Sequence, residues 1–194
     1  MIRATALFAA LLIALPAAPV RAEVVARSDA GFAIKHSVEV AADQQAVWKA
    51  LIAPAKWWAS EHTWSRDAAN LYIDAQASGC FCEKLPKPVD APADQRIGSV
   101  EHMHVIYADP QHGILRMKGA LGPMQGEALD GALTVTLTRT DSGTRIDFEY
   151  VVGGFMRMKT EEIAPAVDRV LGQQLAGLSR LFVPPATEAA TTPG

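Results

Sequence analysis

The chain has 194 residues, of which 49% are hydrophobic and 20% are charged, as in an ordinary globular domain. This composition excludes a collagen, a coiled coil and a wholly disordered tail. With 18 basic against 21 acidic residues the net charge is -3, so the basic field that holds a nucleic-acid backbone is absent and we expect no nucleic-acid partner.

The first 22 residues have the three parts of a secretion signal. Arg3 provides a positive start, residues 6–15 are apolar throughout, and small residues lead to Ala22. A membrane-spanning helix needs about 20 apolar residues, so we expect cleavage after Ala22 and no integral membrane protein. The sequence thus predicts a periplasmic or secreted protein with one domain over residues 23–183, followed by a disordered tail at 184–194.

One strand and two short helices are predicted first. Residues 32–40 alternate apolar and polar side chains as a half-buried strand does, with His36 on the apolar parity. Asp43 can cap a short amphipathic helix that ends near Ile52. Pro54 stops that helix and opens a second short one.

A series of short strands follows a polar stretch. The apolar segments cover residues 71–74, 80–85, 99–107, 114–118, 127–139 and 145–152. Asp141-Ser142-Gly143 is the clearest hairpin turn, because Gly tolerates the positive φ that a tight turn requires. Such a succession predicts an antiparallel meander.

A long amphipathic helix is the last predicted element. Apolar residues between Ile163 and Phe182 fall on one stripe at a 3.6-residue period. Pro165 fits only near the first turn of this helix. The whole order predicts an α+β domain, in which a curved antiparallel sheet of about six or seven strands wraps around the final helix.

Several short segments occur in this order at characteristic places: Ser37-Val38-Glu39-Val40, the Val47-Trp48 pair, and Pro54 followed by Trp57-Trp58. With the order of elements they resemble the START-related (SRPBCC) superfamily, which has the helix-grip fold of the birch-pollen-allergen type. The resemblance covers residues 32–182. Three further segments, at residues 67–71, 79–83 and 119–123, are similar to exported bacterial members of the heat-shock ATPase-activator-like and polyketide cyclase-like branch.

The resemblance implies a deep apolar cavity between sheet and final helix, used across the superfamily for lipids, aromatic polyketides and other hydrophobic molecules. Because fold does not fix function, three interpretations stay open: an exported protein that binds a small hydrophobic molecule, a polyketide cyclase- or dehydratase-like enzyme, and periplasmic metal or redox handling. No cofactor is expected. The candidate ligand-binding residues are Trp57, Trp58, Trp64, Met103, Tyr107, Met117, Tyr150 and Gly172.

A loop with His62, Thr63 and Trp64 follows the Trp57-Trp58 pair and can close over the mouth of the cavity. Aromatic side chains there suit a flat apolar ligand, with His62 as the polar orienting group. The alternative is that the Trp side chains only plug the sheet against the second helix.

Cys80 and Cys82 are two residues apart on a predicted strand, so their side chains share one face. A disulfide between them would be strained, because their Cα separation lies near the upper limit for such a bond, and we expect mostly free thiols. The alternatives are a labile disulfide with a redox role, and a soft-metal site with His102 and His104 of the next strand if the two faces coincide.

Glu101 has the same strand parity as Met103, Val105 and Tyr107. If that face lines the cavity, burial raises the pKa of the Glu101 carboxyl and makes it a candidate general acid or base. The catalytic candidates are therefore Glu101, Tyr107 and His62. The alternative is a hydrated carboxylate, or one paired with a nearby Arg, at the start of the strand.

Two further features leave packing and ligand binding open. Gly172 and Gly177 are poor helix residues, by about 1 kcal/mol each relative to Ala, so they make sense if volume must be absent there, for close packing or for a ligand. Flexible thioethers adapt to varied apolar shapes but also fill cores. Five methionines follow the predicted cleavage point: Met103, Met117, Met124, Met156 and Met158.

Overall fold

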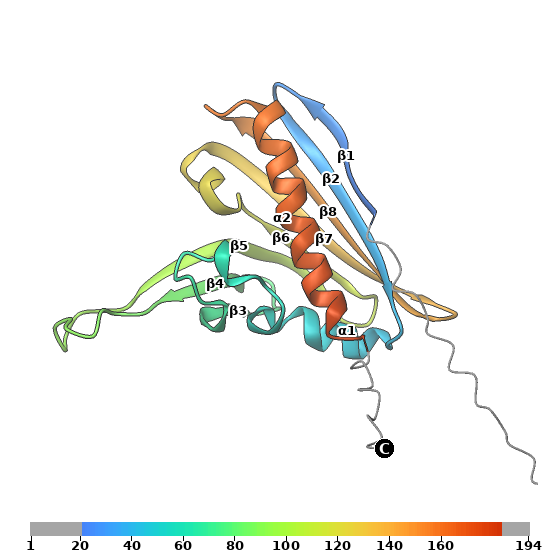
Figure 1. Ribbon diagram of the computed structural model, residues 1–194, viewed down its shortest axis with the longest axis horizontal. Helices are drawn as coiled ribbons and strands as arrows, with labels where there is room; N and C mark the ends of the chain where they lie inside the picture. Colours follow the sequence, from blue (N-terminus) through green and yellow to red (C-terminus); the bar gives the residue numbers. More distant parts are fainter. Residues whose placement is uncertain (1–20, 184–194) are drawn as a thin grey trace, which may run out of the picture.

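The computed structural model describes residues 21–183. Within this range one eight-stranded antiparallel sheet has the order β1-β2-β8-β7-β6-β5-β4-β3, and a long helix lies across it (Figure 1). The predicted secretion signal, apart from its last two residues, and the predicted tail lie outside the described residues. No helix among residues 21–183 is long and apolar enough to cross a membrane.

The strands are β1 (Arg21–Ser28), β2 (Gly31–Val40), β3 (Leu71–Ile73), β4 (Cys80–Leu85), β5 (Gly98–Asp109), β6 (Ile114–Lys118), β7 (Ala128–Thr140) and β8 (Gly143–Phe155). The helices are α1 (Gln44–Leu51) and α2 (Thr160–Arg180), with four short 3-10 turns, η1 (Pro54–Lys56), η2 (Ser60–His62), η3 (Ala68–Asn70) and η4 (Gly122–Gly126). The predicted meander, final helix and α+β class are confirmed.

The sheet has one strand more than the upper expected number, the edge strand β1. Its ladder with β2 shifts register between Val24 and Ala26, so its side chains do not follow the simple alternation that reveals a strand in sequence. The predicted second short helix is the single 3-10 turn η1.

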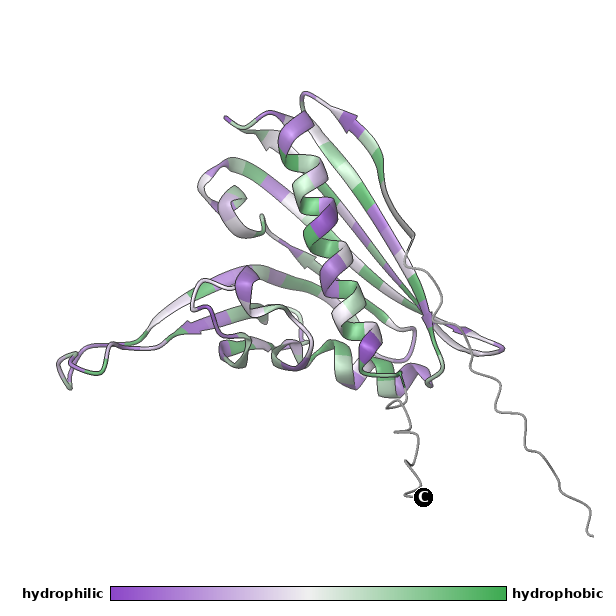
Figure 2. Cartoon of the chain, viewed as in Figure 1, coloured by the Kyte–Doolittle hydropathy of each residue, from purple (hydrophilic) through white to green (hydrophobic). Residues whose placement is uncertain are grey.

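Local sequence explains the elements around the helix. In β2 the apolar parity is buried and His36 is buried with it, and both hydrophobic and hydrophilic stretches occur along the strand (Figure 2). Asp43 caps α1 by accepting a hydrogen bond from the Ala46 N–H at 2.8 Å. Gly143 closes the β7–β8 hairpin with a φ of 149°, which glycine adopts without the steric cost of a side chain.

Helix α2 packs on β1 and β2 through its apolar stripe. A Cβ atom on Gly172 would lie 2.8 Å from Cε1 of His36, and one on Gly177 would lie 2.2 Å from the backbone oxygen of Trp57. Both glycines therefore allow a close approach of the helix. For Gly172 the structure favours the packing interpretation, because the imidazole of His36 occupies the adjacent space.

A β-bulge in β5 changes which side chains face inward. Phe81 pairs with Met103 but Cys82 pairs with Glu101, so His102 is an extra residue in β5. A bulge of this kind interrupts the alternation of side chains. His102 and Met103 are consequently both buried, whereas Glu101 is exposed.

A second register shift lies further along β5. Val105 pairs with Met117 and Tyr107 with Arg116, which leaves Ile106 as the extra residue. Val105 is buried, but Tyr107 is 42% exposed. The predicted single inward face that joins Tyr107 to the buried residues of β5 is therefore wrong.

Candidate functional site

An apolar cavity of about 320 Å³ lies between α2, the loop that follows η1, and the turn η4. The sheet contributes one residue to its lining, His102 of the β5 bulge. The other lining residues are Trp58, Glu61, His62, Thr63 and Trp64 after η1, then Leu121, Gly122, Pro123 and Met124 at η4, and Ile163, Ala166, Val167, Val170 and Leu171 on α2.

The loop from Trp58 to Trp64, here called the wall segment, is fastened to α2 by two glutamines. The Ala59 N–H donates to Oε1 of Gln174 at 2.8 Å. Nε2 of His62 lies 3.0 Å from Oε1 of Gln173. These contacts fix the wall segment relative to the helix that forms the opposite side of the cavity.

The carboxylate of Glu83 in β4 supports the end of the wall segment from the sheet. Its side chain is fully buried and accepts hydrogen bonds from the backbone N–H groups of Trp64, at 3.0 Å, and Ser65. Nε2 of His102 lies 2.9 Å from Oε2 of the same carboxylate. Burial, the largest single influence, opposes ionisation of Glu83, but the hydrogen bonds from Ser65, Trp64 and His102 together keep its pKa below the ordinary value.

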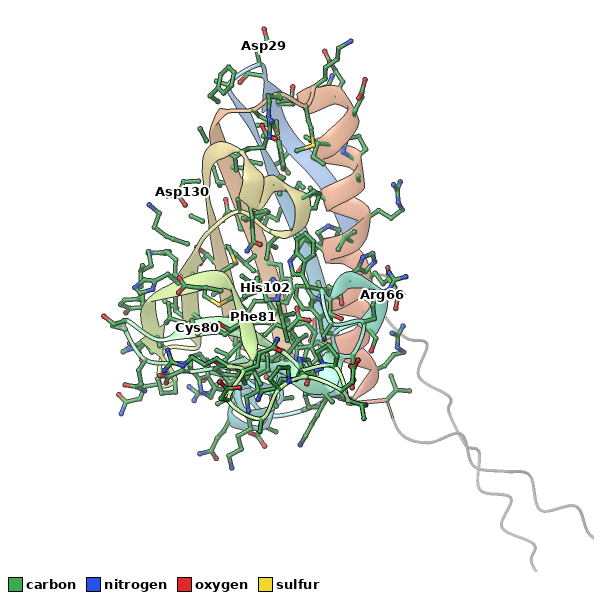
Figure 3. The ribbon with its side chains drawn as sticks, turned by 90° about the vertical axis from the view of Figure 1, so that its left-hand side faces the viewer. Asp29, Arg66, Cys80, Phe81, His102 and Asp130 are labelled. Carbon is green, nitrogen blue, oxygen red and sulfur yellow. A yellow bond between two sulfur atoms is a disulfide. The ribbon has the colours of Figure 1, made fainter. Side chains whose placement is uncertain are left out.

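The Glu83 contact fixes the tautomer of His102. An ionised carboxylate only accepts, so Nε2 of His102 carries the proton. Burial lowers the pKa of His102, although Glu83 acts in the opposite direction, so the ring is neutral at neutral pH and its bare nitrogen is Nδ1. The ring packs 4.9 Å from the ring centroid of Phe81, and the two lie next to each other in Figure 3.

Solved structures share this architecture at low sequence identity. A Mesorhizobium loti protein is 18% identical, with a TM-score of 0.52, over 77% of this chain and 95% of its own. CalU16 from Micromonospora echinospora is 15% identical with a TM-score of 0.50, over 78% of this chain and 74% of its own. A norcoclaurine synthase point mutant from Thalictrum flavum, in complex with a transition-state analogue, is 15% identical with a TM-score of 0.50. The match covers 85% of this chain and 96% of the synthase chain.

The chain shares the helix-grip fold of these structures. No family model matches its sequence, and no curated protein matches it either. The likeness is therefore one of fold alone, and the function must be argued from the cavity of this helix-grip domain itself.

The three predicted tryptophans lie in different surroundings. Trp58 and Trp64 line the cavity. Trp64 is 54% exposed to solvent. Trp57 lies outside the cavity lining: it is buried, and its Nε1 donates to the backbone oxygen of Ala50 at 3.0 Å. The position of Trp57 agrees with the plugging interpretation, whereas Trp58 and Trp64 are part of the cavity lining.

Tyr150 lies behind the cavity wall. Its hydroxyl donates to the backbone oxygen of Gly119 at 2.9 Å and accepts from the Leu121 N–H at 3.2 Å. Complete burial raises the pKa of this phenol above its ordinary value. Tyr150 thus holds the chain where it enters η4, but the structure does not bring it into the cavity lining.

The remaining ligand candidates divide between core and cavity. Met103 and Met117 are buried in the core outside the cavity lining. Met124 lines the cavity, whereas Met156 and Met158 are half-buried residues packed against the core. Gly172 lies outside the lining, as its contact with His36 requires.

Of the three catalytic candidates only His62 lines the cavity. The Tyr107 hydroxyl lies 3.3 Å from Asp109 among exposed residues, and the exposed Glu101 lies 3.5 Å from Nδ1 of His104. The two β5 bulges account for both positions, because they turn Glu101 and Tyr107 away from the buried face.

Cys80 and Cys82 form a disulfide, so the predicted free thiols are wrong. The pair lies where the β4–β5 ladder changes register, and there the two Cα atoms are 5.4 Å apart, well within the range of ordinary disulfides. His104 is exposed beside Cys80, whereas His102 is buried. Residues 21–183 contain no group of three or more Cys, His, Asp or Glu side chains placed to hold a metal ion.

Glu83 was missing from the predicted site. A signal was present, because Glu83 has the same strand parity as the buried Phe81 and so places a carboxylate on an inward position. Its two backbone donors, Trp64 and Ser65, belong to a loop whose approach no periodicity reveals.

Proposed function

We propose that this protein binds a small hydrophobic molecule in the cavity beneath α2. The observation that carries the proposal is the lining, in which apolar side chains of α2, η4 and the wall segment surround a few polar groups, namely Glu61, His62, Thr63 and His102. Ligand sites in proteins combine apolar walls with a small number of placed polar groups in the same way, and start at about 300 Å³. Norcoclaurine synthase, which shares the fold, is solved in complex with a transition-state analogue, and this supports small-molecule binding by a protein of this fold.

The test is fluorescence titration with N-phenylnaphthylamine. We expect saturable binding, and a loss of at least tenfold in affinity for Ala166→Phe, which adds volume inside the cavity. Arg169→Phe is the matched control, because Arg169 is exposed on the same helix outside the lining. Equal affinity of both variants and the parent protein, at equal melting temperature, would contradict the proposal.

A cyclase- or dehydratase-like enzyme is the second candidate. Two imidazoles, those of His62 and His102, line the cavity, and imidazole is the side chain that most often transfers protons near neutral pH. Native mass spectrometry of protein purified from its source would report a co-purifying organic mass. Incubation of that molecule with fresh protein distinguishes the candidates, because a dehydratase returns it lighter by one water and a binding protein returns it unchanged.

We also propose that the protein is exported to the periplasm or secreted, with cleavage after Ala22. The support is the secretion-signal pattern of the first 22 residues and the Cys80–Cys82 disulfide, since disulfides persist in oxidising compartments. N-terminal sequencing of the exported material should begin at Glu23. A cytosolic product that keeps Met1 would exclude export.

A further inference from the structure

The β5 bulge brings a single polar group of the sheet to the cavity. His102 is the extra residue between Met103 and Glu101, and it is buried beside Met103 although neighbouring residues of a regular strand face opposite ways. Without the bulge, the inward position of Met103 would place His102 on the outer face. The irregularity therefore gives the lining its one side chain from the sheet, an imidazole.

Glu83 is completely buried and already accepts three hydrogen bonds, so a ligand does not reach it. Oε1 accepts from the Ser65 N–H, while Oε2 accepts from the Trp64 N–H and from Nε2 of His102. Glu83 is thus a positioning residue, which orients His102 and fixes its proton on Nε2. What the pair can offer to the cavity is Nδ1 of His102.

Nδ1 of His102 is free for a ligand. Among residues 21–183 its ring is hydrogen-bonded only through Nε2. Both ring nitrogens of His36 are completely enclosed and lack a hydrogen-bond partner, but Nδ1 of His102 is not enclosed in this way. The atom therefore keeps some exposed surface, and His102 lines the cavity as well as a second, more open hollow beside β5 and β6.

The ionisable groups around this nitrogen are few. Glu83 faces His102 from β4, and Glu61 and His62 of η2 lie across the cavity. Glu61 accepts a hydrogen bond from Gln173 at 2.7 Å. In the described part of the chain, α2 and η4 contribute no ionisable side chain to the lining.

We infer, on the basis of the proposed function, that His102 recognises the ligand and that the ligand is a hydroxylated aromatic molecule whose O–H donates a hydrogen bond to Nδ1 of His102. A neutral donor fits better than a cation, because the nearby carboxylates already have partners and a cation would lose its hydration in an apolar site. A phenolic O–H is a stronger donor than an alcohol, and Trp58 and Trp64 provide aromatic surface for its ring.

The experiment compares naphthol with methoxynaphthalene, which has the same ring system but no donor. We expect the protein to bind naphthol at least tenfold more tightly. In His102→Phe the preference for naphthol over methoxynaphthalene should disappear. His104→Phe is the matched control on the same strand, since His104 is exposed outside the cavity, and it should keep the full preference.

A pH titration of the parent protein needs no variant and reports on His102 directly. Protonation of Nδ1 removes the acceptor, so the naphthol preference should fall in acid, with a midpoint below the ordinary value of 6.5 because burial lowers this pKa. Equal affinities for the two probes, or a preference that does not depend on pH, would overturn the inference while N-phenylnaphthylamine binding still upholds the proposed function. Failure to bind any of the three probes would overturn both.

Discussion

Two buried histidines each lie about 3 Å from a carboxylate, and the two pairs differ in their hydrogen bonds and their surroundings. Nε2 of His36 is 3.0 Å from Asp168, and Nε2 of His102 is 2.9 Å from Glu83. Glu83 is completely buried and accepts from three donors. Asp168 is partly exposed, and its contact with His36 is close but poorly aligned, so the atoms on both sides lack a hydrogen-bond partner.

The surroundings of the two rings explain the difference. His36 lies under Gly172, where β2 and α2 pack together and no space remains, whereas His102 lies at the cavity. A histidine and a carboxylate at nearly the same separation can therefore fill an interface or present a polar atom to a ligand. The distinguishing marks are a carboxylate that accepts three hydrogen bonds and a second ring nitrogen that keeps some exposed surface.

The largest expected effect is a loss of stability when the carboxylate of Glu83 is removed, compared with removal of the carboxylate of Asp168. Glu83→Ala leaves the N–H groups of Trp64 and Ser65 and Nε2 of His102 without an acceptor in a buried place, and should cost about 3–5 kcal/mol of stability. Asp168→Ala should cost about 1 kcal/mol, because this carboxylate is partly hydrated and poorly aligned. Urea unfolding of the two variants measures the difference, and equal losses would refute the contrast.

Gly172→Leu tests the crowded surroundings of His36. A Cβ atom alone would already lie 2.8 Å from this imidazole, so we expect a loss of about 1–3 kcal/mol through overpacking. The affinity for N-phenylnaphthylamine should not change, since Gly172 lies outside the cavity lining. Thermal melts and probe titration on the same variant decide: weaker binding at full stability would mean that Gly172 faces the ligand.

The smallest expected effect is a decrease in the free energy of unfolding as the solution becomes mildly acidic. Burial lowers the pKa of both His36 and His102 in the folded protein, against the opposing effect of their carboxylates. Below the ordinary histidine pKa of 6.5, the unfolded chain therefore binds more protons than the folded protein does. The stability that is present above this pH is lost as the pH falls toward the lower pKa values of the folded state. Melting temperatures between about pH 8 and about pH 5 measure this loss. His36→Phe should reduce the slope, and an unchanged slope would show that His36 does not contribute.

The sequence was informative wherever the alternation was regular. The inward face of β2, the Asp43 cap and the stripe of α2 could be predicted, because each depends on the spacing of a few neighbouring residues. The inward face of β5 could not, because an inserted residue changes the parity without a distinctive residue type. Gly172 showed that volume must be absent, but only the packed structure shows that His36 takes the space.

The composition of the cavity lining has an evolutionary consequence. Since His102 is the single residue that the sheet contributes, the hydrogen-bonded ladders can stay constant while the wall segment, η4 and one face of α2 change. Substitutions in those three segments alter the shape and polarity of the cavity without disturbing strand pairing. Ligand preference can thus diverge among proteins of this architecture faster than the architecture itself, and the β5 bulge is the one place where a change of preference would also have to change the sheet.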